Sequence, residues 1–188
     1  MKAYQKERLE NAICYFASEH FKKTRKLPTQ TYIYKYLSLF EFQILEETGE
    51  APLGLKYRAM KRGPVPIEIY NNRRDINSEC FCFEERDDNI FDVRALKMPN
   101  MDYFSEYEIQ KMKNLIFTYA TPYMTSHIMS ESSHEKIRAW RIAYNERGEN
   151  SIIDNSDTFE DLSKKDEKDL TPQEEHFLIS ESLKNVGV

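Results

Sequence analysis

The sequence predicts an α+β fold, a mostly helical single domain with a small β-hairpin or sheet. Several segments repeat apolar residues at helical spacing, one segment alternates apolar and polar positions, and turn residues separate them. The chain has 188 residues, of which 40% are hydrophobic and 13% are aromatic, so it can fill a sizeable core. These totals favour one domain with an appended segment.

Two N-terminal helices are predicted from apolar stripes. In residues 5–25 the stripe includes Ile13 and Phe16, which recur at the spacing of one helix face. Residues 30–47 carry apolar side chains on several faces, and a helix of that kind is usually central. Gly49 is expected to end this second helix.

A stiff segment follows, with the sequence "YRAMKRGPVP" at residues 57–66. Each proline fixes its own φ near about −65° and pushes the residue before it toward extended geometry. Pro66 fits the first position of a short helix over residues 67–74, where its missing N–H costs nothing. The structural motif of this segment is predicted to be Gly63, Pro64, Val65 and Pro66.

The next predicted elements are a hairpin and a helix. Residues 80–97 alternate apolar and polar positions on both sides of a polar "RDDN", which is the pattern of a β-hairpin. Ser105 and Glu108 then form a capping box, which predicts a helix over residues 106–119.

Two further helical segments complete the predicted body of the protein. A shorter turn of helix is expected near residues 122–130. A longer helix over residues 134–147 carries one apolar face and is expected to stop at Gly148. The predicted domain therefore covers residues 1–148.

Residues 149–188 form an acidic C-terminal extension. They hold eleven Asp or Glu and four Lys or Arg, so their formal charge is −7. Because the whole chain has a formal charge of −5, residues 1–148 carry +2. Dense charge and sparse apolar residues predict a linker or loosely held segment. Thr171 can cap a final helix that starts at Pro172 and docks either on the body or on a partner.

Catalytic motifs are missing from the sequence. It contains no Gly-rich phosphate loop, no nucleophile elbow and no HExxH zinc helix. Cys80 and Cys82 lack a second matching pair and a histidine at ligand spacing, so we expect no metal site. The sequence therefore favours a protein that is no enzyme and that uses no cofactor.

The sequence also carries no targeting signal that we recognise. It has no run of 18 apolar residues, and its N-terminal segment lacks the apolar stretch of a signal peptide. We therefore expect a cytoplasmic protein without membrane contact.

Two residues near the end of the predicted domain have expected structural roles. His134 lies at a predicted helix start, where a lone histidine more often caps or packs beside Trp140 than catalyses. Trp140, the single tryptophan, is expected to anchor the core and to donate its indole N–H to a backbone carbonyl.

Candidate partner-binding residues bracket the stiff segment. A rigid loop rimmed by cations can bind an acidic surface, and aromatic side chains beside it can act as anchors. The alternative is a solvated face without a partner. The candidates are Tyr57, Arg58, Lys61, Arg62, Tyr70, Arg73 and Arg74.

The order of these motifs resembles the Panacea domain, also called the SocA-like antitoxin domain. The resemblance rests on "KYLSLFE" at residues 35–41, "GEAPLG" at 49–54, "YRAMKRGPVP", "FSEYE" at 104–108 and "SSHEKIRAW" at 132–140. The family occurs in bacterial toxin–antitoxin pairs and in proteins associated with phages and mobile elements. The resemblance implies a fold of the Panacea type and an antitoxin that neutralises a cognate toxin by direct contact.

The resemblance also implies a partner, the toxin, encoded by an adjacent gene. One family member is similar to a proteolytic adaptor, so delivery of the toxin to a bacterial protease is an alternative. The basic cluster beside the short helix motivates another alternative, a regulator that binds the operator DNA of its own operon. The weakest alternative is an enzyme that uses His134 with nearby carboxylates.

Overall fold

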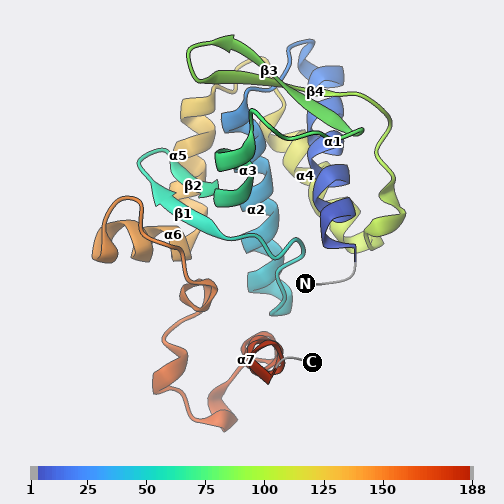
Figure 1. The fold of residues 1–188 in the computed structure, drawn as a ribbon. Coiled ribbons are helices and arrows are strands. Elements are labelled where there is room, and N and C mark those ends of the chain that lie inside the picture. Colours follow the sequence, from blue (N-terminus) through green and yellow to red (C-terminus); the bar gives the residue numbers. More distant parts are fainter. Residues whose placement is uncertain (1–3, 187–188) are drawn as a thin grey trace.

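The computed structural model describes residues 4–186 and has the mostly helical α+β fold that the sequence predicts (Figure 1). The helices are α1 (Gln5–Thr24), α2 (Gln30–Thr48), α3 (Ile67–Asn72), α4 (Glu106–Tyr119), α5 (Ser126–Lys136), α6 (Arg138–Ile142) and α7 (Pro172–Val186). The strands form two antiparallel hairpins, β1 (Tyr57–Met60) with β2 (Gly63–Pro66), and β3 (Phe81–Asp87) with β4 (Ile90–Ala95).

Helix α2 is the central element, as its apolar residues on several faces predict. It packs against α1, α4, α5, α7 and both hairpins, and it runs through the middle of the body (Figure 1). Tyr36, Leu37 and Phe40 are completely buried, and the ring of Phe16 from α1 stacks on Tyr36 with centroids 4.9 Å apart. Burial on all sides explains why this helix lacks a polar face.

The β3–β4 hairpin covers one end of α1 and α2. Phe81 pairs with Ala95, the register shifts between Glu85 and Asp87, and Val93 donates its backbone N–H to the carbonyl of Pro28 over 2.8 Å. Phe91 and Val93 are buried, so the alternating pattern of the sequence presents one face of the hairpin to the core.

The helical boundaries after residue 120 differ from the prediction. Thr125 caps α5 by accepting from the N–H of Ile128 over 3.2 Å, so the short turn predicted near 122–130 is the start of an 11-residue helix. The single helix predicted over residues 134–147 is wrong. Ile137 leaves the helical region with φ −106° and ψ 94°, which separates α5 from α6. A π-helical turn over Ala143–Arg147 then leads to Gly148.

The acidic extension is packed against the body over much of its length. Ala59 of β1 donates to the carbonyl of Ser151 over 2.9 Å, and Ile153 donates to the carbonyl of Tyr57 over 3.0 Å. Phe159 is buried, and Arg138 donates to its carbonyl. For residues 150–159 the prediction of a linker or loosely held segment is therefore wrong, because backbone pairing with an open strand edge compensates for the sparse apolar residues.

Helix α7 docks on the body at the end of α2. His176 Nδ1 lies 2.7 Å from the carbonyl oxygen of Thr48, and Phe177 is buried with its ring 5.1 Å from that of Phe159. Gly49, with φ +77°, lies so close to α7 that a Cβ there would overlap the carbonyl oxygen of Gln173. The sequence left open whether the final helix docks on the body or on a partner, and in the structure it docks on the body.

Among residues 4–186, no helix has both the length and the apolar character that crossing a membrane requires.

Candidate partner-binding surface

The β1–β2 hairpin displays the stiff segment. Met60 pairs with Gly63 across a turn made of Lys61 and Arg62, and Gly63 has a φ of +95° that glycine adopts at little cost. All four residues of the predicted structural motif, Gly63, Pro64, Val65 and Pro66, are buried. The hairpin thus combines a buried strand with an exposed tip.

Pro66 lies one position earlier than predicted. It is the last residue of β2 and the N-cap of α3, with φ −70° and ψ 118°, and the helix begins at Ile67. The predicted helix over residues 67–74 is also shorter, since α3 ends at Asn72. Proline suits the N-cap because its φ is fixed in a range that both the strand and the helix start accept.

Lys35 of α2 holds β2 from inside the molecule. Its side chain is only 1% exposed, and its Nζ donates to the carbonyl of Pro64 over 3.0 Å. Burial disfavours the ammonium and lowers the pKa of Lys35 to about 7. The sequence reasoning missed this residue, although a lysine within the apolar run "YIYKYLSLFEF" is a usable signal.

Glu41 is a second buried charge on α2 that the sequence reasoning missed. Its two carboxylate oxygens accept from the backbone N–H groups of Leu53 and Leu55, each over 2.9 Å. The residue is 0% exposed. Glu41 thereby fixes the connection between α2 and β1, since two backbone donors would otherwise be buried without partners.

An aromatic stack supports the hairpin from the side of α5 and α6. The ring of His134 stacks on that of Trp140 at 3.9 Å, and Trp140 stacks on Tyr144 at 4.9 Å. The indole N–H of Trp140 donates to the carbonyl of Met60 over 3.1 Å. His134 does pack beside Trp140, and the indole N–H donates to a backbone carbonyl as expected. The predicted placement of His134 at a helix start is wrong, because it lies in the last turn of α5, which begins eight residues earlier at Ser126.

His134 also meets the groups behind Gly63. Its Nε2 is buried, and a Cβ on Gly63 would lie 3.3 Å from its ring. Burial lowers the pKa of His134, the charge of Lys35 lowers it further, and Glu131 opposes this shift. The imidazole is therefore neutral at neutral pH and acts as an aromatic ring rather than as a cation.

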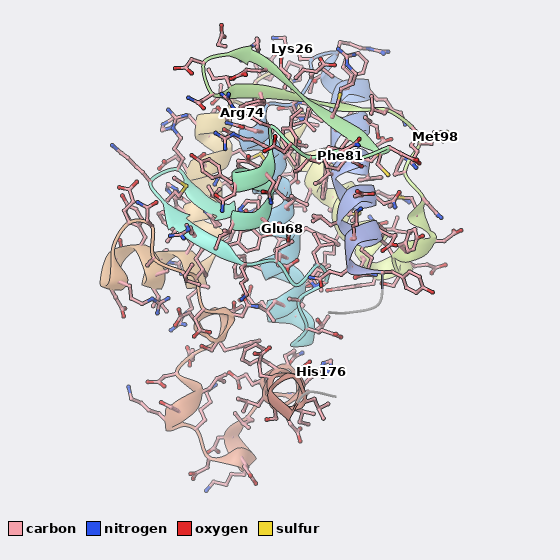
Figure 2. The ribbon with its side chains drawn as sticks, viewed as in Figure 1. Lys26, Glu68, Arg74, Phe81, Met98 and His176 are labelled. Carbon is pink, nitrogen blue, oxygen red and sulfur yellow. The ribbon has the colours of Figure 1, made fainter. Side chains whose placement is uncertain are left out.

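The predicted cations form two groups that contact different elements. Arg58, Lys61 and Arg62 are exposed on the β1–β2 hairpin, and Arg58 donates to the carbonyl of Asn150 over 3.1 Å. Arg73 and Arg74 instead lie beside the β3–β4 hairpin, near which Figure 2 labels Arg74. The prediction that these five cations form one rim around the stiff segment is therefore wrong, because they lie beside two different hairpins.

The second group is occupied by local contacts. The guanidinium of Arg73 lies over the ring of Tyr70 at 4.4 Å and donates to the carbonyl of the same residue. Arg74 pairs with Glu85 over 2.6 Å and lies 5.5 Å from the ring centroid of Phe91. These arginines hold α3 against the hairpin and are less available to a partner than Lys61 and Arg62.

The two predicted tyrosine anchors lie inward. Tyr57 is 1% exposed, its ring centroid lies 5.3 Å from that of Phe42, and its hydroxyl has no hydrogen-bond partner. Burial, and then the charge of Glu41, raise the pKa of Tyr57 well above its usual value. Tyr57 therefore offers no surface to a partner, and Tyr70 is half-buried beneath Arg73.

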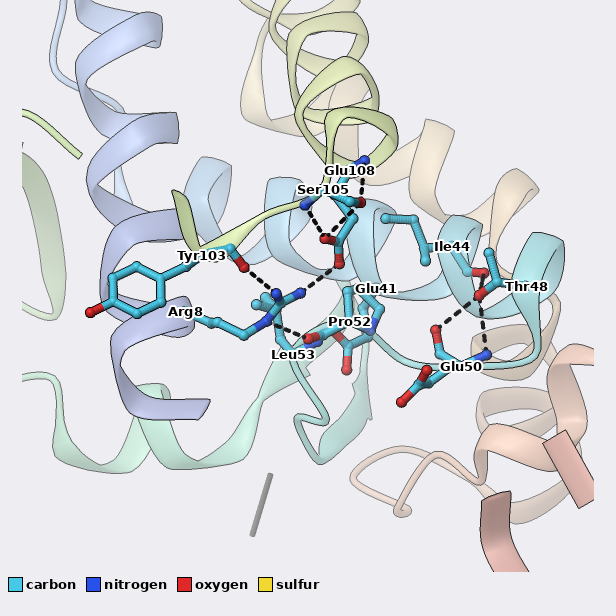
Figure 3. Close-up of polar contacts among 10 residues, drawn as sticks. All are labelled: Arg8, Glu41, Ile44, Thr48, Glu50, Pro52, Leu53, Tyr103, Ser105 and Glu108. Atoms are coloured by element: carbon cyan, nitrogen blue, oxygen red, sulfur yellow. Dashed lines mark hydrogen bonds and ion pairs between the residues drawn. The ribbon is translucent and has the colours of Figure 1, made fainter. Parts of the chain in front are cut away.

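A separate polar cluster ties α1 to the start of α4 and to the loop that follows α2 (Figure 3). Arg8 of α1 donates to the carbonyls of Pro52 and Tyr103 and pairs with Glu108 of α4. Glu108 also accepts from Ser105 over 2.8 Å, which completes the predicted capping box. A cavity of about 400 Å³ lies beside this cluster, but its charged groups are used in structural contacts.

Comparison with known proteins places this arrangement in a family. The model of the antitoxin SocA-like, Panacea domain matches residues 33–141, which run from α2 to α6 and include Lys35, the β1–β2 hairpin and Trp140. No curated protein and no solved structure shows a significant match to the chain. Because the family match spans more than half of the chain, the protein belongs to the SocA-like antitoxin family with a Panacea domain.

Proposed function

We propose that the protein is an antitoxin that neutralises a cognate toxin by direct contact. Membership of the SocA-like antitoxin family carries this proposal, because it ties the chain to toxin–antitoxin systems in general. The toxin is the product of an adjacent gene, and the contact takes place in the cytoplasm.

The tip of the β1–β2 hairpin is the surface that we assign to the toxin. Lys35 and Trp140 hold the hairpin from two sides, whereas Lys61 and Arg62 at its tip are exposed. A loop that is already rigid loses little conformational entropy when it binds. Exposed cations complement an acidic surface and speed association.

Neutralisation by contact needs no catalytic group, and the buried groups support that interpretation. Lys35 and Ser133 meet behind Gly63, but they are 1% and 0% exposed. Ser133 already donates to the carbonyl of Ser130 over 2.7 Å. A substrate has no access to side chains buried to this degree, so we propose no enzymatic role for them.

Co-expression with the product of the neighbouring gene tests the proposal. The protein should rescue growth and co-purify with that product. Lys61→Glu/Arg62→Glu should slow association and weaken rescue, since two attractive charges become repulsive. The matched control is Arg25→Glu/Lys26→Glu, which reverses two exposed cations on the α1–α2 connection and should rescue like the parent.

Other outcomes would overturn the proposal in defined ways. If the neighbouring product is neither toxic nor bound, the protein is no antitoxin of that gene pair. Rescue by the hairpin variant at parental strength would move the toxin contact to another surface. If the toxin level falls in cells only when a cellular protease is present, and no stable complex forms, the adaptor function replaces neutralisation by contact.

A further inference from the structure

A cleft with positive charge lies at the end of the molecule opposite α7. It is bordered by the α1–α2 connection, the β3–β4 hairpin and the start of α5, and its volume is about 760 Å³. Lys26, on this connection, and His176, on α7, are labelled at opposite ends in Figure 2. The charged residues that line this basic cleft are Arg25, Lys26, Arg86, Arg94 and Asp92.

These four cations and one carboxylate leave a formal charge of +3 in a protein whose net charge is −5. Arg94 pairs with Glu84 over 2.6 Å, and Arg86 lies 3.4 Å from Asp92. Within the part of the chain that the structure describes, Arg25 and Lys26 form no ion pair. Two exposed cations at the edge of the cleft are therefore available to an anionic ligand.

Exposed aromatic rings accompany these cations. Phe21 lines the cleft and is 41% exposed, and Tyr123, between two further lining residues, is 88% exposed. Phe117 is 76% exposed, and the ammonium of Lys23 lies 4.8 Å from its ring centroid. Single exposed apolar residues are common, but Phe21 lies in the lining of the cleft, Tyr123 lies next to that lining in the chain, and Phe117 contacts Lys23, two positions before Arg25. Each of these exposed rings is accessible for stacking.

The base of the cleft is held by neutral groups. Tyr32 donates its hydroxyl to the carbonyl of Met124 over 2.7 Å, which ties α2 to the segment before α5. His20 lies 2.9 Å from the hydroxyl of Tyr36, and burial lowers the pKa of His20 to about 4. His20 is thus uncharged at neutral pH, so the positive charge of the cleft comes from its exposed edge.

We propose that this basic cleft binds single-stranded nucleic acid. Arg25 and Lys26 attract the phosphates, and the rings of Tyr123 and Phe117 stack on bases. Stacking of this kind requires unpaired bases, because a duplex keeps its base faces covered. The site is separate from the β1–β2 hairpin, so it goes beyond the proposed contact with a toxin.

Fluorescence anisotropy with a short labelled oligothymidylate tests the charged part of the site. At about 50 mM salt the protein should bind, and the affinity should fall as salt rises because counterions are released. Arg25→Glu/Lys26→Glu should weaken binding by about tenfold or more. Lys61→Glu/Arg62→Glu, the matched control on the hairpin, should bind like the parent.

The aromatic part of the site has its own readout. Tyr123→Ala and Phe117→Ala should each weaken binding by about fivefold while leaving the salt dependence unchanged, since stacking releases no counterions. Both side chains are exposed, so the melting temperatures should equal that of the parent.

Three results would overturn the proposal. The first is that the parent protein does not bind the oligothymidylate even at the lowest salt. The second is that a folded Arg25→Glu/Lys26→Glu variant binds it with the affinity of the parent. The third is that the protein binds a duplex more tightly than either of its separate strands. The last result would favour an operator-binding role instead. Growth rescue by Arg25→Glu/Lys26→Glu should be normal in every case, which separates this test from that of toxin neutralisation.

Discussion

Both backbone geometry and packing require a glycine at position 63. Its φ is +95°, and a Cβ would lie 2.6 Å from Ser133 Oγ and 2.7 Å from Lys35 Nζ. Gly63→Ala should therefore lower the free energy of unfolding by at least about 1–3 kcal/mol, the cost of a strained backbone position. Chemical denaturation of the variant and the parent measures this difference.

Gly148 provides the matched control for that prediction. Its φ of +92° is nearly the same, but a Cβ there would meet nothing within 4 Å. Gly148→Ala should show the cost of the backbone alone, so Gly63→Ala should be the more destabilising of the two. Equal losses would mean that Ser133 and Lys35 move aside freely.

Lys35 makes the stability of the protein depend on pH. In the folded state its pKa is lowered to about 7 from 10.5, so between these values the unfolded chain binds the extra proton. The free energy of unfolding therefore rises with pH across this window. The contribution of Lys35 has a slope of at most about 1.4 kcal/mol per pH unit.

Comparison with Lys35→Met isolates this effect from other groups that titrate. The variant keeps a long side chain but removes the charge, so the increase in stability from pH 7 to pH 10 should be smaller than in the parent. Urea denaturation at several pH values gives both curves. Parallel curves would show that Lys35 titrates as an ordinary exposed lysine does.

At the scale of elements, the extension has two attachment points and an exposed stretch between them. Residues 151–153 pair with β1, and Phe177 of α7 is buried on the body. No side chain among residues 161–170 is buried. A protease of broad specificity, such as proteinase K, should therefore cut first within residues 161–170, whereas residues 150–159 should resist, as denaturing gels of a time course will show.

The fragment that carries α7 should remain bound after this cut. Phe177 and the contact between His176 and Thr48 stay intact, so gel filtration should give one peak of unchanged size. Phe177→Ala removes the main apolar anchor and should release the fragment. Early cutting within residues 150–159 would contradict the docked arrangement of the extension.

At the scale of the whole molecule, charge is divided between two ends. The extension carries −7 and the rest of the chain +2, and the basic cleft lies at the end opposite α7 (Figure 2). The β1–β2 hairpin presents a second pair of exposed cations. Because the two basic surfaces are on different elements, paired charge reversals can separate their functions.

Most of the helical framework could be predicted from the sequence. The first two helices and the capping box of α4 depend on periodicity and on neighbours a few positions apart. The break at Ile137 could not be predicted, because the apolar pattern continues through it. The partner of the Trp140 indole N–H could not be predicted either, because Met60 lies 80 positions away and reaches Trp140 only once the β1–β2 hairpin has folded.

Only those parts of the candidate site that depend on local sequence were predicted. The stiff segment and the roles of His134 and Trp140 were identified, since few residue types can occupy such positions. Lys35 and Glu41 were missed because α2 alone does not show which neighbours will bury them. Their partners, Pro64 and the segment after Gly49, lie more than ten positions away.

The sequence by itself determined the helix-rich fold class, the stiffness of the Gly-Pro-Val-Pro segment and the resemblance to the antitoxin family. These depend on local torsion angles, on the spacing of apolar residues and on the order of short motifs. Only the tertiary structure decided that Tyr57 is buried, that the cations form separate groups and that the acidic extension docks. Burial and pairing depend on contacts between residues far apart in the chain, and local spacing does not specify such contacts.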